Sequence, residues 1–397
     1  MADFKAYVVG GAVRDALLGR PSDDRDWVVV GATPQQMVAV GFMPVGRDFP
    51  VFLHPQTREE YALARTERKT APGYHGFTFH ADAAVTLEQD LARRDLTINA
   101  MAFDERGALV DPYGGKSDIE SRVLRHVSPA FAEDPVRILR LARFAARFHD
   151  FTVAQETLAL ARRMVDGGEV DALVPERVWQ ELARGLMEAH PSRMLRVLRD
   201  CGALARLLPE IDRLWQVAPP SGAGHGAVED LLHSLDISAQ IDCELPQRFA
   251  CLGHAVGPDL PLLNALCRRL RVPLECRELA EVTAREQPVV DGSETLDAAA
   301  LLGLLERSDA FRRPERFEAM LRACECIARG RSKLQREPFA QRAHLQRVLF
   351  AALEVDTASV AARAAAHGIV GPGVGHAIRE ARRLAIAATL LSAQRRD

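Results

Sequence analysis

Gly10-Gly11-Ala12-Val13-Arg14-Asp15, followed by Asp24-Arg25-Asp26 and the apolar run Trp27-Val28-Val29-Val30, decides the fold of this chain. The glycines come directly after Tyr7-Val8-Val9, so the backbone can turn there from a strand into a helix and present its amide groups to an anion. Arg14, one turn into that helix, is placed to reach the same anion. The turn lacks the G-x-G-x-x-G of a dinucleotide site and the Gly-Lys-Ser/Thr of a P-loop.

Asp24 and Asp26 form the second half of this pattern. Side chains two residues apart on a strand point to the same face, with Cα atoms about 7 Å apart. A divalent cation can bridge two carboxylates at that separation, and Mg²⁺ prefers a few hard oxygens together with substrate phosphates. The pattern predicts metal-assisted chemistry on a phosphate group.

Composition sets the frame for the 397-residue chain, which is long enough for two to four domains. It contains no apolar run of about 18 residues and no secretory signal, so we expect a cytoplasmic protein without membrane segments. The seven cysteines are an odd number without C-x-x-C spacing, which favours reduced thiols over disulfides or a zinc site. The net charge of −3 leaves room for a local basic groove, because arginines cluster at residues 137–147 and 379–383.

The pattern of apolar residues predicts an α+β fold. Short β-like runs occur at residues 7–9, 27–30, 51–53 and 61–64, and Thr33 and Thr86 are placed to cap helices. After residue 116 the apolar spacing is almost entirely helical. Pro219-Pro220-Ser221-Gly222-Ala223-Gly224 breaks that helical region. We therefore predict a mixed-sheet domain at 1–115, a helical domain at 116–218 and a helical C-terminal region at 219–397.

Four further motifs follow the opening block. They are Arg65-Thr66-Glu67, Arg93-Arg94-Asp95-Leu96-Thr97-Ile98-Asn99-Ala100, Asp111-Pro112-Tyr113-Gly114-Gly115 and Glu133-Asp134-Pro135-Val136-Arg137-Ile138-Leu139-Arg140. In this order, over about residues 5 to 215, the set resembles the class II tRNA nucleotidyltransferases, which comprise CCA-adding enzymes and bacterial poly(A) polymerases. The resemblance implies a polymerase-β-like nucleotidyltransferase head with a mixed sheet, followed by an all-α neck, body and tail. It also implies Mg²⁺ as cofactor, CTP and ATP as substrates, and tRNA as partner.

The resemblance gives roles to the residues of the head. Asp24 and Asp26 would hold the metal, with Glu60 as the third catalytic carboxylate, although Glu59 is adjacent to it. The tRNA 3′-hydroxyl would attack the α-phosphorus and release pyrophosphate. Among the nucleotide-binding residues, Gly11 and Arg14 would lie at the phosphates, and Arg94, Asp95 and Asn99 match the family motif around the ribose.

Asp134 and Arg137 are three residues apart and therefore share a face of the predicted helix. A carboxylate acceptor beside a guanidinium donor matches the Watson–Crick edges of C and A, whereas U and G reverse both polarities. A mismatched buried group costs about 1–3 kcal/mol, so protein side chains could serve as the template. Arg140 and Arg143 continue this face and would hold phosphate or base.

The region after residue 225 resembles a degenerate HD-type metal phosphohydrolase domain. His233 and His254 look like remnants of it, but Ala255 stands where the metal-binding aspartate is needed. Alanine offers no ligand, so we expect a helical scaffold without phosphohydrolase activity.

Two alternatives remain from the sequence. A poly(A) polymerase shares the head, but residues 24–31 and 47–52 resemble the proteobacterial CCA-adding group, and no strongly basic C-terminal extension is present. A tRNA-binding protein with an inactive head is the second alternative, and the retained Asp24 and Asp26 argue against it. The sequence does not predict an oligomeric state, nor whether one chain adds both C and A.

Overall fold

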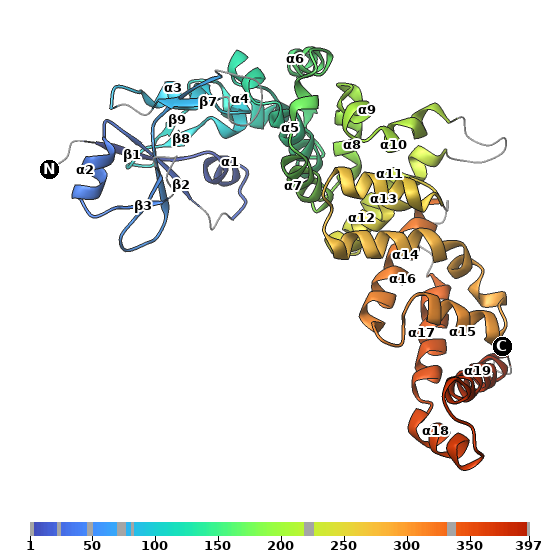
Figure 1. Ribbon diagram of the computed structural model, residues 1–397. Helices are drawn as coiled ribbons and strands as arrows, with labels where there is room; N and C mark the ends of the chain where they lie inside the picture. The colour runs from blue at the N-terminus through green and yellow to red at the C-terminus, as the bar shows by residue number, and fades with distance from the viewer. Residues whose placement is uncertain are drawn as a thin grey trace. The chain divides into compact units, whose positions relative to one another are not determined.

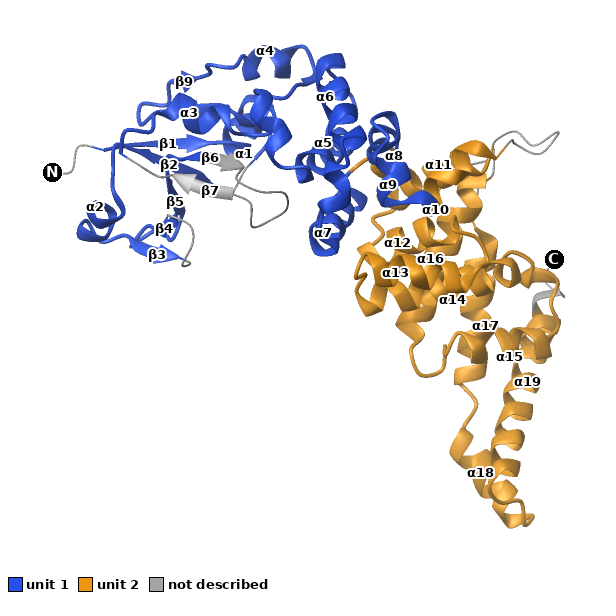
Figure 2. Cartoon of the chain, turned by 45° about the horizontal axis from the view of Figure 1, so that its top comes forward, with its two compact units in different colours: residues 1–188, 193–209 blue, residues 189–192, 210–397 orange. Residues whose placement is uncertain are grey.

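The computed structural model describes residues 4–21, 25–45, 51–69, 77–80, 83–217, 226–331 and 339–394 (Figure 1). The chain forms two compact units. The first contains Met1–Glu188 and Arg193–Pro209, and the second contains Ala189–Ser192 and Glu210–Asp397 (Figure 2). Sequence composition places boundaries near residues 115 and 218, and the breaker at 219–224 lies outside the described residues.

The strands of the first unit gather mainly in one mixed sheet. They are β1 (Lys5–Val9), β2 (Asp26–Val30), β3 (Met43–Val45), β4 (Val51–Leu53), β5 (Glu60–Leu63), β6 (Thr66–Lys69), β7 (Phe77–His80), β8 (Ala102–Phe103), β9 (Leu109–Val110), β10 (Val123–Leu124) and β11 (Thr152–Val153). The seven-stranded sheet has the order β3-β4-β5-β2-β1-β8-β9. Within it β2 and β5 are parallel, and the other neighbours are antiparallel. The four predicted strands correspond to β1, β2, β4 and β5, which confirms them.

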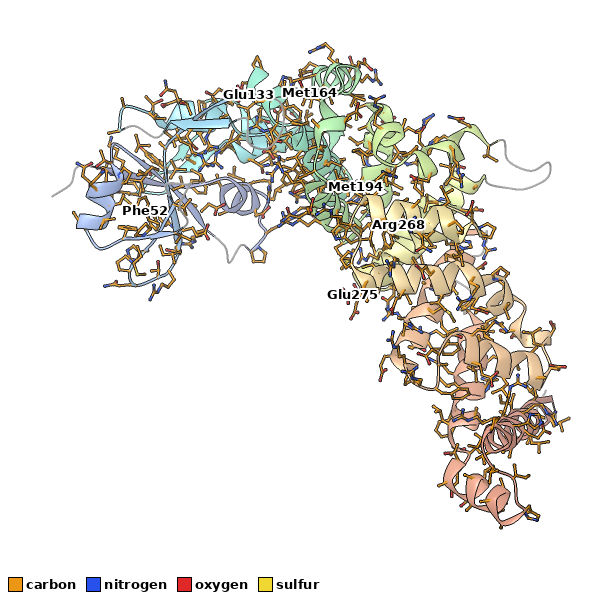
Figure 3. The ribbon with its side chains drawn as sticks, in the orientation of Figure 1. Phe52, Glu133, Met164, Met194, Arg268 and Glu275 are labelled. Carbon is orange, nitrogen blue, oxygen red and sulfur yellow. The ribbon has the colours of Figure 1, made fainter. Side chains whose placement is uncertain are left out.

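Alternation along β2 gives the sheet two buried faces. Val28 packs with Val9 and Leu91 on one face, whereas Val29 packs with Phe52 and Met37 on the other. Helix α3 (Leu87–Ala92) packs on the face that contains Val28, and α2 (Pro34–Ala39) packs on the face that contains Val29. Phe52 lies within this sheet in Figure 3. The Asp26 end of β2 is exposed, and its register partner on β5 is Glu60.

Both predicted helix caps are present. Thr33 accepts a hydrogen bond from the backbone N–H of Gln36, and Thr86 accepts one from that of Gln89. In each case the glutamine side chain in turn accepts a bond from the backbone N–H of the capping residue, which completes a capping box. These local signals fix where α2 and α3 begin.

The first unit also contains helices between and after these strands. They are α1 (Gly11–Leu17), α4 (Gly115–Glu120), α5 (Val136–Arg147), α6 (Gln155–Asp166), α7 (Pro175–Leu186) and α9 (Ala203–Leu207), with the short 3-10 helices η1 (Thr97–Asn99), η2 (Pro129–Glu133) and η3 (Glu169–Ala172). Helix α8 (Pro191–Asp200) belongs mostly to this unit. Helices α5 and α7 pack against each other. A Cβ on Gly185 of α7 would collide with Met194 of α8, labelled in Figure 3, so glycine permits this close approach.

All described elements after residue 209 are helical. They are α10 (Pro209–Asp212), η4 (Arg213–Gln216), α11 (Ala227–Gln240), α12 (Leu245–His254), α13 (Leu260–Arg269), α14 (Leu274–Asp291), η5 (Ser293–Thr295), α15 (Ala298–Arg307), α16 (Pro314–Arg331), α17 (Ala340–Leu353), α18 (Thr357–Ala366) and α19 (Pro372–Gln394). Helix α12 packs against α14, and α11 against α16. All seven cysteines are buried and none forms a disulfide in the structure. Among the described helices, none is both long and apolar enough to span a membrane.

Candidate active site

The first unit contains a cavity of about 810 Å³ with a strongly basic lining. Its wall includes ten arginines, at positions 14, 65, 93, 94, 137, 140, 143, 147, 177 and 184. Four acidic residues share the wall, namely Asp26, Asp95, Asp134 and Glu181. This excess of positive charge contrasts with the net charge of −3 for the chain. The cavity is therefore suited to a polyanion of nucleotide size.

The predicted glycine turn forms one end of this cavity. Gly10 connects β1 to α1 with φ 72° and ψ −127°, a conformation that L side chains rarely adopt. A Cβ at this position would also lie 3.0 Å from Nη1 of Arg94. Both Gly10 and Gly11 line the cavity, so their backbone is accessible to a ligand.

Replacing Gly10 with alanine is expected to destabilise the fold by about 1–3 kcal/mol, because the substitution strains the backbone and displaces Arg94. Nucleotide binding should weaken as well. Denaturant unfolding and equilibrium binding measure the two effects. Gly107 also has a positive φ, of 77°, but a Cβ there meets no atom within 4 Å, so Gly107→Ala controls for backbone strain alone. Equal nucleotide affinity in the two variants would contradict a role for this turn.

Arg14 and Asp95 are the centres of one buried polar network. Arg14 donates to both carboxylate oxygens of Asp15 at 2.9 Å and to Oδ1 of Asn99 at 2.5 Å. Asn99 in turn donates to Oδ1 of Asp95 at 3.0 Å. Arg140 reaches Oδ2 of Asp95 through Nε at 2.7 Å. The structure thus brings together these five residues, four of which are predicted site residues.

Charge pairing keeps this network ionised. Burial by itself raises the pKa of the Asp95 carboxyl, but Arg140 and the hydrogen bond from Asn99 outweigh it and hold the pKa at about 2. The same contact with Asp95 raises the pKa of Arg140. Burial lowers the pKa of Arg14, whose side chain is only 4% exposed. The network fixes two cavity arginines in place and leaves the lining basic.

Phe144 makes cation–π contacts with three of the cavity arginines. The guanidinium carbons of Arg14, Arg140 and Arg143 lie 5.4, 5.8 and 4.5 Å from the centre of its ring. Cation–π contacts of this kind orient a guanidinium while leaving its N–H edges available. Helix α5 therefore supplies Arg140 and Arg143 together with the aromatic residue that orders them.

The predicted metal carboxylates are only partly described. Asp26 begins β2 and lines the cavity, and Glu60 begins β5 directly opposite it in the parallel register. The neighbouring Glu59 accepts a hydrogen bond from the Thr57 hydroxyl at 2.9 Å. Asp24 lies outside the described residues. Within the described ranges no group of three or more His, Cys, Asp or Glu side chains is arranged to hold a metal.

Asp134 and Arg137 both line the cavity, and each is held by residues outside the pair. Asp134 accepts two hydrogen bonds from Arg177, at 3.1 and 2.7 Å, and one from the backbone N–H of Val136. Arg137 donates to the carbonyl oxygens of Ala130 at 2.5 Å and Arg93 at 2.6 Å. The prediction that the two residues share a face of one helix is wrong for Asp134, which has an extended backbone (φ −119°, ψ 105°) before Pro135, the N-cap of α5, whereas Arg137 lies in the first turn of α5. Their spacing in the sequence therefore does not identify the groups that position these two side chains.

Sequence reasoning missed three supporting residues. Asp90, fully buried in α3, pairs with Arg93 and Arg94. Burial raises the pKa of the Asp90 carboxyl, but these two arginines hold it below its usual range. On α7, Arg177 supports Asp134, and Glu181 accepts from Arg143 at 2.7 Å. The four-residue spacing of Arg177 and Glu181 on a predicted helix was an available signal.

The second unit holds both histidines that suggested an HD-type site, His233 within α11 and His254 in α12. His254 ends α12, next to Ala255, and its Nδ1 is buried without a hydrogen-bond partner in the described part of the chain. Burial and the nearby Arg331 lower its pKa to about 4. The neighbouring Asp291 accepts from Arg331 at 2.9 Å and from Gln287 at 2.6 Å. The Asp291 carboxylate, which by itself would raise the pKa of His254, is therefore already paired with the guanidinium of Arg331.

A neutral, partly buried His254 makes stability depend on pH. Its pKa is about 4 in the folded chain, whereas the ordinary value for an exposed histidine is 6.5. The unfolded chain therefore binds more protons between these values, so stability is complete above pH 6.5 and falls as the pH drops towards 4. We expect His254→Asn to flatten this part of the denaturation profile by on the order of 2 kcal/mol. Parallel profiles for the two proteins would contradict the buried neutral form.

Comparison with known proteins identifies the class. Residues 6–125 match the family model of the poly A polymerase head domain. Residues 150–214 match that of the probable RNA and SrmB-binding site of polymerase A. With the mixed sheet and the basic cavity, these matches indicate a head of the poly A polymerase type, followed by helices that match the second model.

Whole-chain relatives give the family. The multifunctional CCA protein of Leptothrix cholodnii is 61% identical over 404 residues, covering 97% of this chain and 96% of the relative. The one of Variovorax paradoxus is 58% identical over 417 residues, covering 97% and 99%. This chain belongs to the multifunctional CCA protein family.

Solved structures support the fold. The Bacillus stearothermophilus CCA-adding enzyme in complex with CTP has a TM-score of 0.65 and 23% identity, covering 99% of this chain and 94% of that one. The Thermotoga maritima CCA-adding enzyme complexed with tRNA has a TM-score of 0.64 and 21% identity, covering 99% and 92%. The predicted α+β fold, with a nucleotidyltransferase head followed by a mainly helical remainder, is confirmed, and β10 and β11 are the strands described beyond residue 116.

Proposed function

We propose that this chain builds the CCA end of tRNA from CTP and ATP by nucleotidyl transfer, without a nucleic-acid template. One observation carries the proposal. The same basic cavity is lined by Asp26, a predicted metal carboxylate at the start of the central strand β2, and by Asp134 and Arg137, the predicted base readers. Family membership and the relatives' names support the same reaction.

Asp24, Asp26 and Glu60 are the residues that would hold Mg²⁺. The fit rests on the parallel pairing of β2 with β5, which aligns Asp26 with Glu60 at the starts of two neighbouring central strands. Hard carboxylate oxygens are the ligands that Mg²⁺ prefers. When bound, the metal supplies positive charge for the attacking and leaving oxygens of phosphoryl transfer.

The chain's own side chains bind and orient the nucleotide. Arg94 donates to Asp90 through Nη2 at 3.2 Å, while its buried Nε has no partner among the described residues. Together with the amides of Gly11 and the guanidinium of Arg14, it would hold the triphosphate. In the reaction the tRNA 3′-oxygen forms a bond to the α-phosphorus, the α–β bridging bond breaks and pyrophosphate leaves. The hydroxyl proton is lost to solvent.

Base choice would come from Asp134 and Arg137. The exocyclic amine of C or A donates to the carboxylate, and the ring acceptor of the same base receives from the guanidinium. U and G present a carbonyl to Asp134 and an N–H to Arg137, which leaves both protein groups unpaired. Arg140 and Arg143 would hold phosphate or base beside them.

We propose further that the HD-like region has lost phosphohydrolase activity and that the reaction takes place in the cytoplasm. Ala255 provides no metal ligand, and Arg331 already pairs with Asp291. Seven cysteines free of disulfides fit a reducing compartment. Purified protein should show no metal-stimulated phosphatase turnover, and turnover that His254→Ala abolishes would contradict this.

Three tRNA substrates test the proposed function. They end before the first C, after one C and after CC, and each is incubated with every labelled NTP in turn and with Mg²⁺. We expect C on the first two, a single A on the third, and no further extension. Unlimited A tails would indicate a poly(A) polymerase instead, and tRNA binding without incorporation would indicate an inactive head.

A further inference from the structure

The side chain of Arg177 is bound to the carboxylate that the proposed function assigns to base reading. Its Nη1 lies 3.1 Å from Oδ1 of Asp134 and its Nη2 lies 2.7 Å from Oδ2. Both side chains are partly buried, with exposed fractions of 26% for Arg177 and 20% for Asp134. Such a two-point contact fixes the plane of a carboxylate as well as its position, which a single point charge cannot do.

The contact also limits how many acceptor positions Asp134 can offer. Oδ1 receives the backbone N–H of Val136 at 3.1 Å in addition to Nη1 of Arg177. A carboxylate oxygen accepts about two hydrogen bonds, so Oδ1 is filled. Oδ2 receives Nη2 of Arg177 at 2.7 Å, the single described donor that reaches it. One acceptor position therefore remains on Oδ2, which matches the one outward N–H of an exocyclic amine.

Helix α7 is built to hold this arrangement. Arg177 lies in its first turn, and Glu181, four residues later on the same face, accepts from Arg143 of α5 at 2.7 Å. The Glu181 carboxylate is only 6% exposed. Two ion pairs thus connect α7 to α5 and the residues just before it. In one, the arginine is on α7 (Arg177 with Asp134, just before α5), and in the other, about two turns further along, the arginine is on α5 (Arg143 with Glu181). This pairing sets the rotation and position of α5 relative to α7.

We propose that Arg177 is a positioning residue for base selection, which leaves Asp134 a single directed acceptor for the exocyclic amine of C or A. The inference rests on the proposed function, because it acts through the contact between Asp134 and the base. Without Arg177 the carboxylate can rotate and take up water, so its preference for an amine over a carbonyl or a hydrogen decreases.

An analogue without the amine isolates this effect. The test compares CTP with the triphosphate of pyrimidin-2-one riboside, which lacks the 4-amino group, on a tRNA that ends before the first C. The readout is the ratio of kcat/KM for the two nucleotides. Since both use the same primer, triphosphate site and carboxylates, a general loss of activity cancels in the ratio.

We expect Arg177→Ala to lower kcat/KM for CTP by about 10- to 30-fold and that for the analogue by less than about 3-fold. Arg177→Gln keeps the side-chain stem and serves if the alanine variant does not fold. Arg177→Lys should recover part of the ratio at most, since an ammonium cannot make the two-point contact. In an Asp134→Ala background, Arg177→Ala should change the ratio by less than about 2-fold.

Arg206→Ala is the matched control. It removes another arginine–carboxylate pair of the same unit, with Asp171, where both side chains are about half exposed. The ratio should equal that of the unchanged chain. A ratio that falls equally in Arg206→Ala and Arg177→Ala would overturn the proposal.

Two outcomes separate the inference from the function on which it rests. If Asp134→Ala lowers the ratio but Arg177→Ala and Arg177→Gln do not, Arg177 has no positioning role while base reading by Asp134 stands. If Asp134→Ala leaves the ratio unchanged, both the base-reading role and the inference fail. Equal losses for CTP and the analogue in the Arg177 variants would show a purely structural role and overturn the inference.

Discussion

Replacing Asp26 with alanine is expected to lower nucleotide incorporation by about 1000-fold or more, while tRNA affinity stays within about 2-fold. Asp26 lies at the exposed start of β2 in the wall of the basic cavity. Removing a metal carboxylate withdraws charge stabilisation from the transferring phosphoryl group, and about 4 kcal/mol corresponds to this loss in rate. Single-turnover extension of tRNA and a filter-binding titration measure the two quantities. Unchanged incorporation would contradict the metal assignment.

The adjacent pair Glu59 and Glu60 supplies a matched comparison for the third carboxylate. Glu60 is aligned with Asp26 across the parallel strands, whereas Glu59 is occupied with the Thr57 hydroxyl in the preceding loop. We therefore expect Glu60→Ala to lower the rate by about 100-fold and Glu59→Ala by less than about 3-fold. A larger loss of rate for Glu59→Ala than for Glu60→Ala would instead assign the role of third carboxylate to Glu59.

Replacing Asp134 with alanine is expected to produce the second large effect, a loss of about 10- to 100-fold in kcat/KM for both CTP and ATP. The exocyclic amine of either base then has no acceptor, which corresponds to about 1–3 kcal/mol. UTP should gain relative to CTP, since no carboxylate repels its 4-carbonyl. Competition between labelled NTPs on one tRNA measures this shift. Loss of ATP use alone would contradict a shared template for both bases.

Asp171→Ala is the control for this change, since it also removes a carboxylate from an arginine, but at an exposed pair. Its selectivity should match that of the unchanged chain. A shift of similar size in the control would assign the effect of Asp134→Ala to general loosening of the unit.

Local signals in the sequence are sufficient to predict the strands and caps around the site. The alternation at residues 27–30, the Thr33 and Thr86 caps and the glycine turn each depend on neighbours a few residues away, and all are present. The two-residue strands β8 and β9 were not predicted. At that length alternation carries no signal, and β8 joins the sheet only through long-range pairing with β1, while β9 pairs with β8 as the edge strand.

The hydrogen-bond partners of the site residues cannot be predicted from local sequence either, because they also depend on long-range contacts. Their spacing suggests that Asp134 and Arg137 act as neighbours. In the structure, however, the side chain of Asp134 pairs with Arg177, which is 43 residues away in the sequence. The Asp95–Arg140 pair spans 45 residues and likewise depends on how α5 docks on the head. Motifs therefore suggest candidate site residues, whereas the network that orients these side chains requires the tertiary structure.

The most direct test of the account is a crystal structure of this chain bound to CTP, compared with the same crystals bound to ATP. We predict that both triphosphates lie beside Gly11 and Arg94. The exocyclic amines of both bases should lie within about 3.2 Å of the Asp134 carboxylate, with their ring acceptors facing Arg137. Binding of either base away from Asp134 and Arg137 would contradict the claim that one set of side chains selects both nucleotides.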